Sequence, residues 1–62
     1  MKLKDCKEIL ENAHNKEDHI LGMELEAIEV ALDFNTSALT MLEYNYLRAT
    51  RLLILEILDN RS

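Results

Sequence analysis

The sequence predicts an all-α protein: an antiparallel helical hairpin, with or without a short extra N-terminal helix, that forms a homodimeric four-helix-type bundle. The 62-residue chain has no proline and one glycine, and Leu, Glu, Ala and Ile dominate it. These residues mostly lose little conformational freedom in a helix, whereas one valine and three aromatic residues leave little from which to build strands. A single run of turn and capping residues, at 33–37, separates two stretches that have the apolar periodicity of helices.

The first helix is expected to span about residues 3–33. The Asn and His residues between positions 12 and 15 are mediocre helix formers, and Asn15 is suited to cap a fresh helix with Glu17 and Asp18 at its positive end. Residues 3–14 are therefore either a separate short helix, with a break near 14–16, or the first turns of one long helix. We favour the continuous helix.

The second helix is expected to span about residues 36–60, after the turn at 33–37. Asn35 is suited to the N-cap position, because its side-chain oxygen can accept a hydrogen bond from a free N–H group of the next turn. Phe34 and Leu39 have the spacing of a hydrophobic staple, which fixes the angle at which the chain enters the helix.

The second helix is apolar on two opposite sides when its residues are placed at intervals of about 100°. The side suited to the hairpin core carries Ala38, Leu42, Tyr46, Ala49, Leu53 and Ile57. The opposite side carries Leu47, Ile54 and Leu58, flanked by Tyr44 and Leu55. Exposing the four aliphatic side chains of this opposite side would forfeit about 1.5–3 kcal/mol each, a sum comparable with the whole stability of a small domain. We therefore expect another element or another chain to cover it.

The simplest cover for this opposite side is a second copy of the chain. A domain of this length buries little surface, and Cys6 is the only cysteine, so no internal disulfide can supply the missing stability. We predict a homodimer with an oligomer or partner interface made of Tyr44, Leu47, Arg51, Ile54, Leu55 and Leu58. The alternative is a three-helix monomer in which residues 3–14 fold back over the same side, with an apolar face of Leu3, Cys6, Ile9, Leu10 and Ala13.

The first helix is apolar over more than half of its circumference, with one flank of Ile20, Met23, Ala27, Val30, Ala31 and Phe34 and another of Leu21, Leu25, Ile28 and Leu32. Glu24 lies near the middle of this apolar arc, where a charge needs a partner. Folding the hairpin about Asn35 puts residue 24 level with residue 46. We hypothesise a buried polar group of Glu24, Tyr46 and Asn45, in which Tyr46 or Asn45 donates a hydrogen bond to Glu24 and fixes the register of the hairpin. The alternative is a packed glutamate stem whose carboxylate reaches water.

The chain is acidic, and its acidic residues are concentrated in the middle. It has 12 acidic and 7 basic residues, and no Lys or Arg lies between Lys16 and Arg48. Three acidic residues of the first helix, Glu26, Glu29 and Asp33, form a candidate docking stripe for a protein partner. The alternative is an ordinary solvated face.

This charge distribution argues against nucleic-acid binding, because proteins that bind nucleic acids neutralise the phosphates with Lys and Arg. Residues 28–45 have a helix-turn-helix-like spacing, but the positions that would read DNA contain neither Lys nor Arg. In length and two-helix plan the chain also resembles plasmid copy-control proteins, which dimerise through helical hairpins and bind RNA loops. The resemblance is architectural, and the acidic middle argues against transferring the RNA-binding role.

No catalytic residue, metal ligand or cofactor is predicted. Glu11 and His14 have the Glu-x-x-His spacing of di-iron bundles, but a solvated pair is the expected state. One glycine cannot build a phosphate-binding loop. The sequence contains no apolar stretch long enough for a signal peptide or a membrane span, and a lone cysteine fits a reducing compartment, so we expect a cytoplasmic protein with no membrane partner.

These observations favour a small non-enzymatic protein–protein interaction module. We expect a homodimeric regulator that binds itself and an unidentified protein partner, as small phage and bacterial regulators do. Two alternatives remain: a nucleic-acid-binding transcriptional or RNA regulator, and a structural subunit of a larger helical assembly.

Overall fold

A computed structural model, which describes residues 3–34 and 36–62, confirms that the protein is all-helical. Within these residues there are three α-helices, α1 (Leu3–Asn12), α2 (Asp18–Phe34) and α3 (Met41–Arg61), and no strand. Two short 3-10 helices, Ala13–Asn15 and Thr36–Ala38, lie in the connections. In the described part of the chain, no helix is long and apolar enough to cross a membrane.

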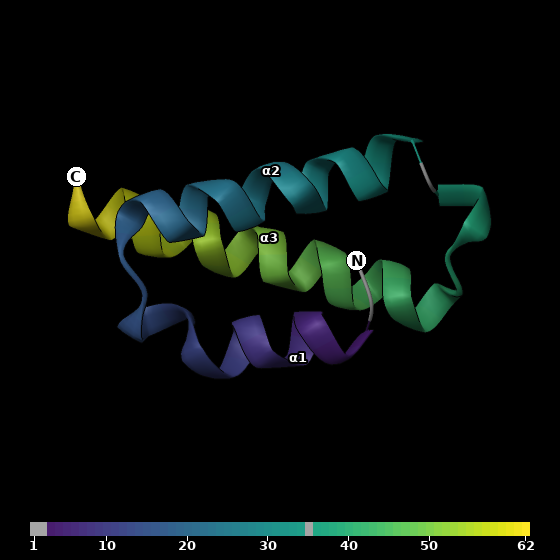
Figure 1. The fold of residues 1–62 in the computed structure, drawn as a ribbon, viewed down its shortest axis with the longest axis horizontal. Coiled ribbons are helices and arrows are strands. Elements are labelled where there is room, and N and C mark those ends of the chain that lie inside the picture. The colour runs from purple at the N-terminus through teal and green to yellow at the C-terminus, as the bar shows by residue number, and fades with distance from the viewer. Residues whose placement is uncertain (1–2, 35) are drawn as a thin grey trace.

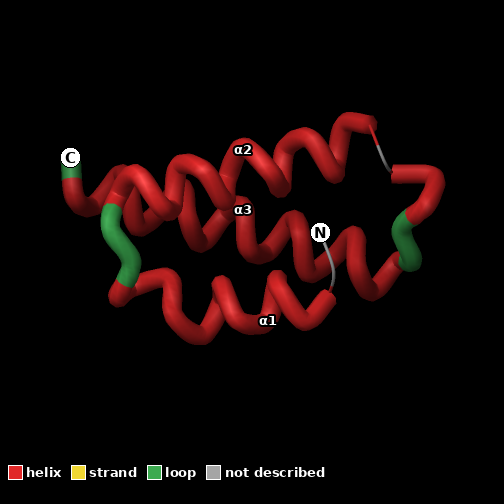
Figure 2. Tube along the Cα trace, viewed as in Figure 1, coloured by secondary structure: helices red, strands yellow, loops and turns green. Residues whose placement is uncertain are grey.

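Helix α3 is the central element of the bundle (Figure 1). Both α1 and α2 pack against α3, and they contact each other much less. Helix α2 runs antiparallel to the other two helices, so α1 and α3 run in the same direction, and Figure 2 shows the two connections at opposite ends of the bundle. Residues 28–45 thus span the end of α2, the connection and the start of α3 in an antiparallel hairpin, unlike the steep crossing of a helix-turn-helix.

The prediction of one continuous helix over about residues 3–33 is wrong. The helix is interrupted close to residues 14–16, where the alternative placed a break. The side chain of Asn12 donates a hydrogen bond to the carbonyl of Glu8 at 3.1 Å, which is the kind of local bond that competes with helix continuation. After the 3-10 helix Ala13–Asn15, Lys16 is extended, with φ −95° and ψ 150°. The extended residue lets the chain reverse, and α1 becomes a separate helix.

Helix α3 begins at Met41 rather than near Thr36, because Thr40 is its N-cap. The Thr40 hydroxyl accepts a hydrogen bond from the backbone N–H of Glu43 at 3.2 Å, and the Glu43 carboxylate accepts one from the Thr40 backbone N–H at 3.1 Å. This reciprocal pair is a capping box. Hydrogen bonds from the backbone and then the hydroxyl of Thr40 hold the pKa of Glu43 below its ordinary value.

The predicted N-cap Asn35 lies outside the described residues. The staple predicted between Phe34 and Leu39 is wrong, because Phe34 is largely exposed while Leu39 packs against the core. The turn therefore does not hold the entry to α3 by an apolar contact between these two side chains, and the capping box at Thr40 sets the start of that helix.

The core is one cluster contributed by all three helices and the connection after α1. Its buried apolar residues are Cys6, Ile9, Ala13, Leu21, Ile28, Ala31, Leu47, Ile54 and Ile57. Among the residues whose burial is described, Thr50 is the buried polar one, and its hydroxyl donates a hydrogen bond to the carbonyl of Tyr46 at 2.7 Å. The side of α3 with Leu47 and Ile54 is therefore covered, as the sequence required, and residues of the same chain cover it.

This packing corrects the predicted faces of α3. Leu47 and Ile54 were predicted as intermolecular contacts, but both are fully buried within the chain and cannot meet a partner without unfolding. Leu42 and Ala49, predicted for the hairpin core, are exposed. The physical reason is that α1 and α2 together fill one wide arc of α3, so the buried residues follow that arc rather than two separate sides.

Candidate functional site

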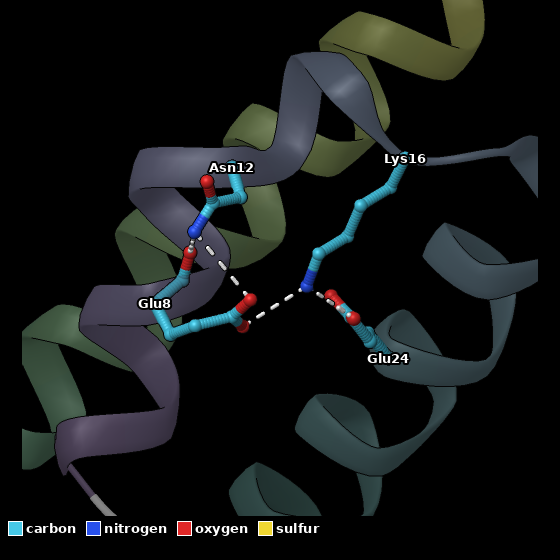
Figure 3. A network of polar contacts seen from close by, with 4 residues as sticks. All are labelled: Glu8, Asn12, Lys16 and Glu24. Atoms are coloured by element: carbon cyan, nitrogen blue, oxygen red, sulfur yellow. Dashed lines mark hydrogen bonds and ion pairs between the residues drawn. The ribbon is translucent and has the colours of Figure 1, made fainter.

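Lys16 joins α1 to α2 through two carboxylates (Figure 3). Its ammonium nitrogen lies 3.0 Å from a carboxylate oxygen of Glu8 and 2.7 Å from one of Glu24. The side chains of Lys16 and Glu24 are 17% and 19% exposed, whereas that of Glu8 is 54% exposed. Because α1 and α2 pack little against each other directly, these ion pairs form a polar bridge between the two helices.

Glu24 is a partly buried charge with a partner, but the predicted partners are wrong. Lys16 donates to Glu24, whereas Asn45 is exposed and Tyr46 lies half-buried with the Lys7 ammonium 5.7 Å from its ring centroid. Among the described residues, the second carboxylate oxygen of Glu24 is buried and has no hydrogen-bond partner. The register of α2 against α3 is therefore not fixed by a polar contact of Glu24 with α3.

Arg61, in the last turn of α3, forms a second polar bridge, which the sequence analysis did not predict. Its guanidinium donates to the carbonyl of Lys16 at 2.7 Å, to the carboxylate of Asp18 at 2.9 Å and to the carbonyl of His14 at 2.9 Å. The carboxyl end of α3 thereby holds the connection between α1 and α2, and the start of α2 is fixed in place.

The outer side of α2 carries an exposed row of apolar side chains, which we call the α2 apolar stripe: Ile20, Met23, Ala27, Val30 and Phe34. The four large members are 37%, 67%, 46% and 79% exposed in that order. Spacings of three and four residues place the members along one side of the helix. The other apolar flank of α2 packs into the core through Leu21, Leu25, Ile28 and Leu32, and the residues of the stripe lie outside that cluster.

The predicted acidic stripe, Glu26, Glu29 and Asp33, lies on the exposed surface of α2. Glu29 is turned toward α3, where its carboxylate lies 3.7 Å from the Arg51 side chain. Glu26 and Asp33 are seven residues apart and directly precede Ala27 and Phe34, so they lie along one margin of the α2 apolar stripe.

A shallow groove runs between α2 and α3 on the side where Glu29 meets Arg51. We call this surface the α2–α3 face; its lining residues are Glu29, Leu32, Asp33, Tyr44, Arg48, Arg51 and Leu52. The Arg48 guanidinium lies 5.7 Å from the centroid of the Tyr44 ring. Of the predicted interface residues that α1 and α2 do not bury, Arg51 and Leu55 are exposed, and Tyr44 and Leu58 are half-buried. Leu52, which is 60% exposed, was missed.

The exposed pair Glu11 and His14 is not joined by a third ligand: in residues 3–34 and 36–62, no three His, Cys, Asp or Glu side chains are placed to hold a metal ion. The Cys6 thiol is free and buried. Comparisons of the chain with protein-family models, with curated proteins and with solved structures found no match.

Replacing Lys16 tests whether this polar bridge stabilises the fold, because its contribution to the free energy of unfolding depends on pH. Burial alone would lower the pKa of Lys16, but the hydrogen bonds and charges of Glu24 and Glu8 outweigh it and raise the pKa above the ordinary 10.5. The raised pKa means that the stabilisation is complete below pH 10.5 and is lost as the pH rises through the native pKa. We expect the free energy of unfolding in urea to fall more steeply above pH 10.5 for the native chain than for Lys16→Gln.

The matched control for this measurement is Lys4→Gln, which removes an exposed lysine of α1 and should keep the native slope. Parallel pH curves for the native chain and Lys16→Gln would contradict a stabilising role for the network.

Proposed function

We propose that this protein is a small non-enzymatic interaction module, a homodimeric regulator that binds and modulates another protein. The α2 apolar stripe is the observation that supports this proposal. Isolated exposed apolar residues are normal on any protein, but a contiguous row along a whole helix is typical of a surface that a partner covers. We place the protein in the cytoplasm, where a free thiol such as that of Cys6 stays reduced.

The size of the stripe supports reversible binding. Full burial of a large apolar side chain contributes about 1.5–3 kcal/mol, so Met23 and Phe34 together offer about 3–6 kcal/mol. Association itself costs about 4–15 kcal/mol. A partner therefore needs Ile20, Val30 and polar contacts as well, and the resulting affinity suits an exchangeable regulatory complex.

The stripe belongs to a helix that is already held in its bound shape. The opposite flank of α2 is anchored in the core by Leu21 and Ile28, and Lys16 and Arg61 hold its amino-terminal end. A partner that docks on a preorganised surface loses less conformational entropy than one that must first order it. These contacts support α2 as the recognition element.

Homodimerisation is proposed to occur through the α2–α3 face instead of through Leu47 and Ile54. On this face, acidic residues of α2 lie beside basic residues of α3: Glu29 is level with Arg51, and Asp33 and Arg48 are each about one turn nearer the connection. A two-fold axis parallel to the helices would place α2 of each copy against α3 of the other. Glu29 would then meet Arg51, and Asp33 would meet Arg48, of the second copy.

This arrangement would form a four-helix-type bundle from α2 and α3 of both copies, with each α1 on the outside. Exposed ion pairs contribute only about 0.2–1 kcal/mol each, so their role would be to set the orientation of the two copies. Burial of the exposed side chains of Leu52 and Leu55 would supply the apolar contribution. Because α1 already covers the core, dimerisation would serve regulation and would not be needed for folding.

Partner binding is tested by retrieving a tagged copy of the chain from its native cell. Met23→Gln/Phe34→Gln is expected to lose the partner proteins that the native chain retains, because both side chains are exposed and their replacement leaves the core intact. The matched control is Met41→Gln/Leu42→Gln, which alters exposed apolar residues at the start of α3 and should retain the partners. Equal retention by the two variants would refute the stripe as the binding surface.

Dimerisation is tested by charge reversal and sedimentation equilibrium. We expect Glu29→Lys/Asp33→Lys and Arg48→Glu/Arg51→Glu each to be monomeric at concentrations where the native chain is dimeric, because like charges would then face each other across the two-fold axis. An equimolar mixture of the two variants should dimerise again. A native chain that stays monomeric, or variants that each dimerise like it, would contradict the proposed arrangement.

A further inference from the structure

We infer that the partner segment that docks on the α2 apolar stripe is a basic amphipathic helix, with an apolar seam and Lys or Arg along one margin. The inference rests on the proposed function and names the chemistry of the partner. It is carried by the spacing of the stripe, by the sign of the charges beside it, and by the poor fit of a second copy to the same surface.

The spacing of the stripe fits a helix laid alongside α2. Ile20, Ala27 and Phe34 repeat every seven residues, and Met23 and Val30 repeat in the same way between them. This is the seam of a coiled coil, into which the apolar residues of a facing helix insert. From Ile20 to Phe34 the seam is about 21 Å long at 1.5 Å per residue, so a partner of about four turns covers it. An amphipathic helix in such a site is a common mode of peptide recognition.

The middle of the seam can adapt to a large partner side chain. Ala27 is small and exposed, so it leaves room for a Leu or Phe between the larger residues on either side. Met23 is unbranched and 67% exposed, and methionine side chains rearrange readily around different partners. The stripe therefore favours a partner with bulky apolar residues at its centre.

The charges beside the seam select a basic partner. Glu26 and Asp33 occupy the margin position one residue before Ala27 and Phe34, and within the described chain neither has an ion-pair partner. In coiled coils this margin position contacts the flanking residues of the facing helix and determines its charge preference. Across all of α2 the carboxylates are unopposed by any Lys or Arg of the same helix. Lys or Arg on the partner therefore meets Glu26, and Asp33 adds negative charge at the same margin.

A second copy of this chain fits the stripe poorly. If two α2 helices paired antiparallel about the centre of the seam, the same margins would face each other and Glu26 would lie opposite Glu26 of the other copy. Like charges that face each other across an interface are unfavourable. On the α2–α3 face the opposite holds, since acidic and basic residues lie side by side there. The two surfaces thus favour different occupants; Asp33 lies at their border, whereas Glu26 belongs to the margin of the stripe alone.

The test uses a fluorescently labelled synthetic helix with Leu along its apolar seam and Lys at the positions that flank the seam. Its binding to the protein is measured by fluorescence anisotropy at low ionic strength. The native chain should bind it. Met23→Gln/Phe34→Gln should weaken binding at least tenfold, because the seam loses its two most exposed apolar side chains. Glu26→Gln, which keeps the shape of the margin and leaves the α2–α3 face unchanged, should weaken binding about two- to fivefold.

The matched control is Glu11→Gln, which removes the same net charge from an exposed position on α1 and should leave the affinity unchanged. Binding that is unchanged in the seam variant, or matched by a scrambled Lys/Leu peptide with no apolar seam, would overturn the assignment of a basic helix. Stronger binding of a peptide with Glu in place of Lys would overturn it too. If one of these results is obtained while native partners still require Met23 and Phe34 for retrieval, only the basic helix is refuted and the proposed function stands.

Discussion

The apolar arc of α3 is wider than one neighbouring helix can cover, and the rest of the structure follows from burying it. Leu47 and Ile54 lie in the same cluster as Cys6 and Ile9 of α1 and Leu21 of α2. Burial of such side chains supplies about 1.5–3 kcal/mol each, which is decisive for a domain of this size. The chain therefore breaks after Asn12, because only a separate α1 can reach the flank of α3 that α2 leaves uncovered.

The same constraint determines which surfaces remain for partners. Since α1 takes one flank of α3, α2 packs with one flank only, and its remaining apolar residues stay exposed as the α2 apolar stripe. The polar contacts of Lys16 and Arg61 then fix the connection between α1 and α2, where apolar packing is sparse. Folding and recognition thus use opposite flanks of α2.

Composition and periodicity predicted the helices and the excess apolar arc of α3, because these are local properties of the sequence. They did not decide what covers the arc, because the apolar face of residues 3–14 fits either the same chain or a second one. The Lys16 network was hidden for a related reason: Glu8 and Glu24 are each eight residues away and meet only when the chain reverses between them. The flank of α2 that stays exposed is a consequence of that same reversal. The capping box was predictable from the Thr-x-x-Glu spacing of Thr40 and Glu43, but the prediction placed the N-cap at Asn35 instead.

The reactivity of the single thiol measures the central packing directly. Cys6 lies on the side of α1 that faces the core and is 1% exposed, and burial raises the pKa of its thiol. The thiol should therefore react with a disulfide reagent far more slowly in buffer than in urea. Because the cover belongs to the same chain, that slow rate should not change when the protein is diluted. A thiol that reacts at the unfolded rate, or one whose protection disappears on dilution, would show that α1 is not docked within its own chain.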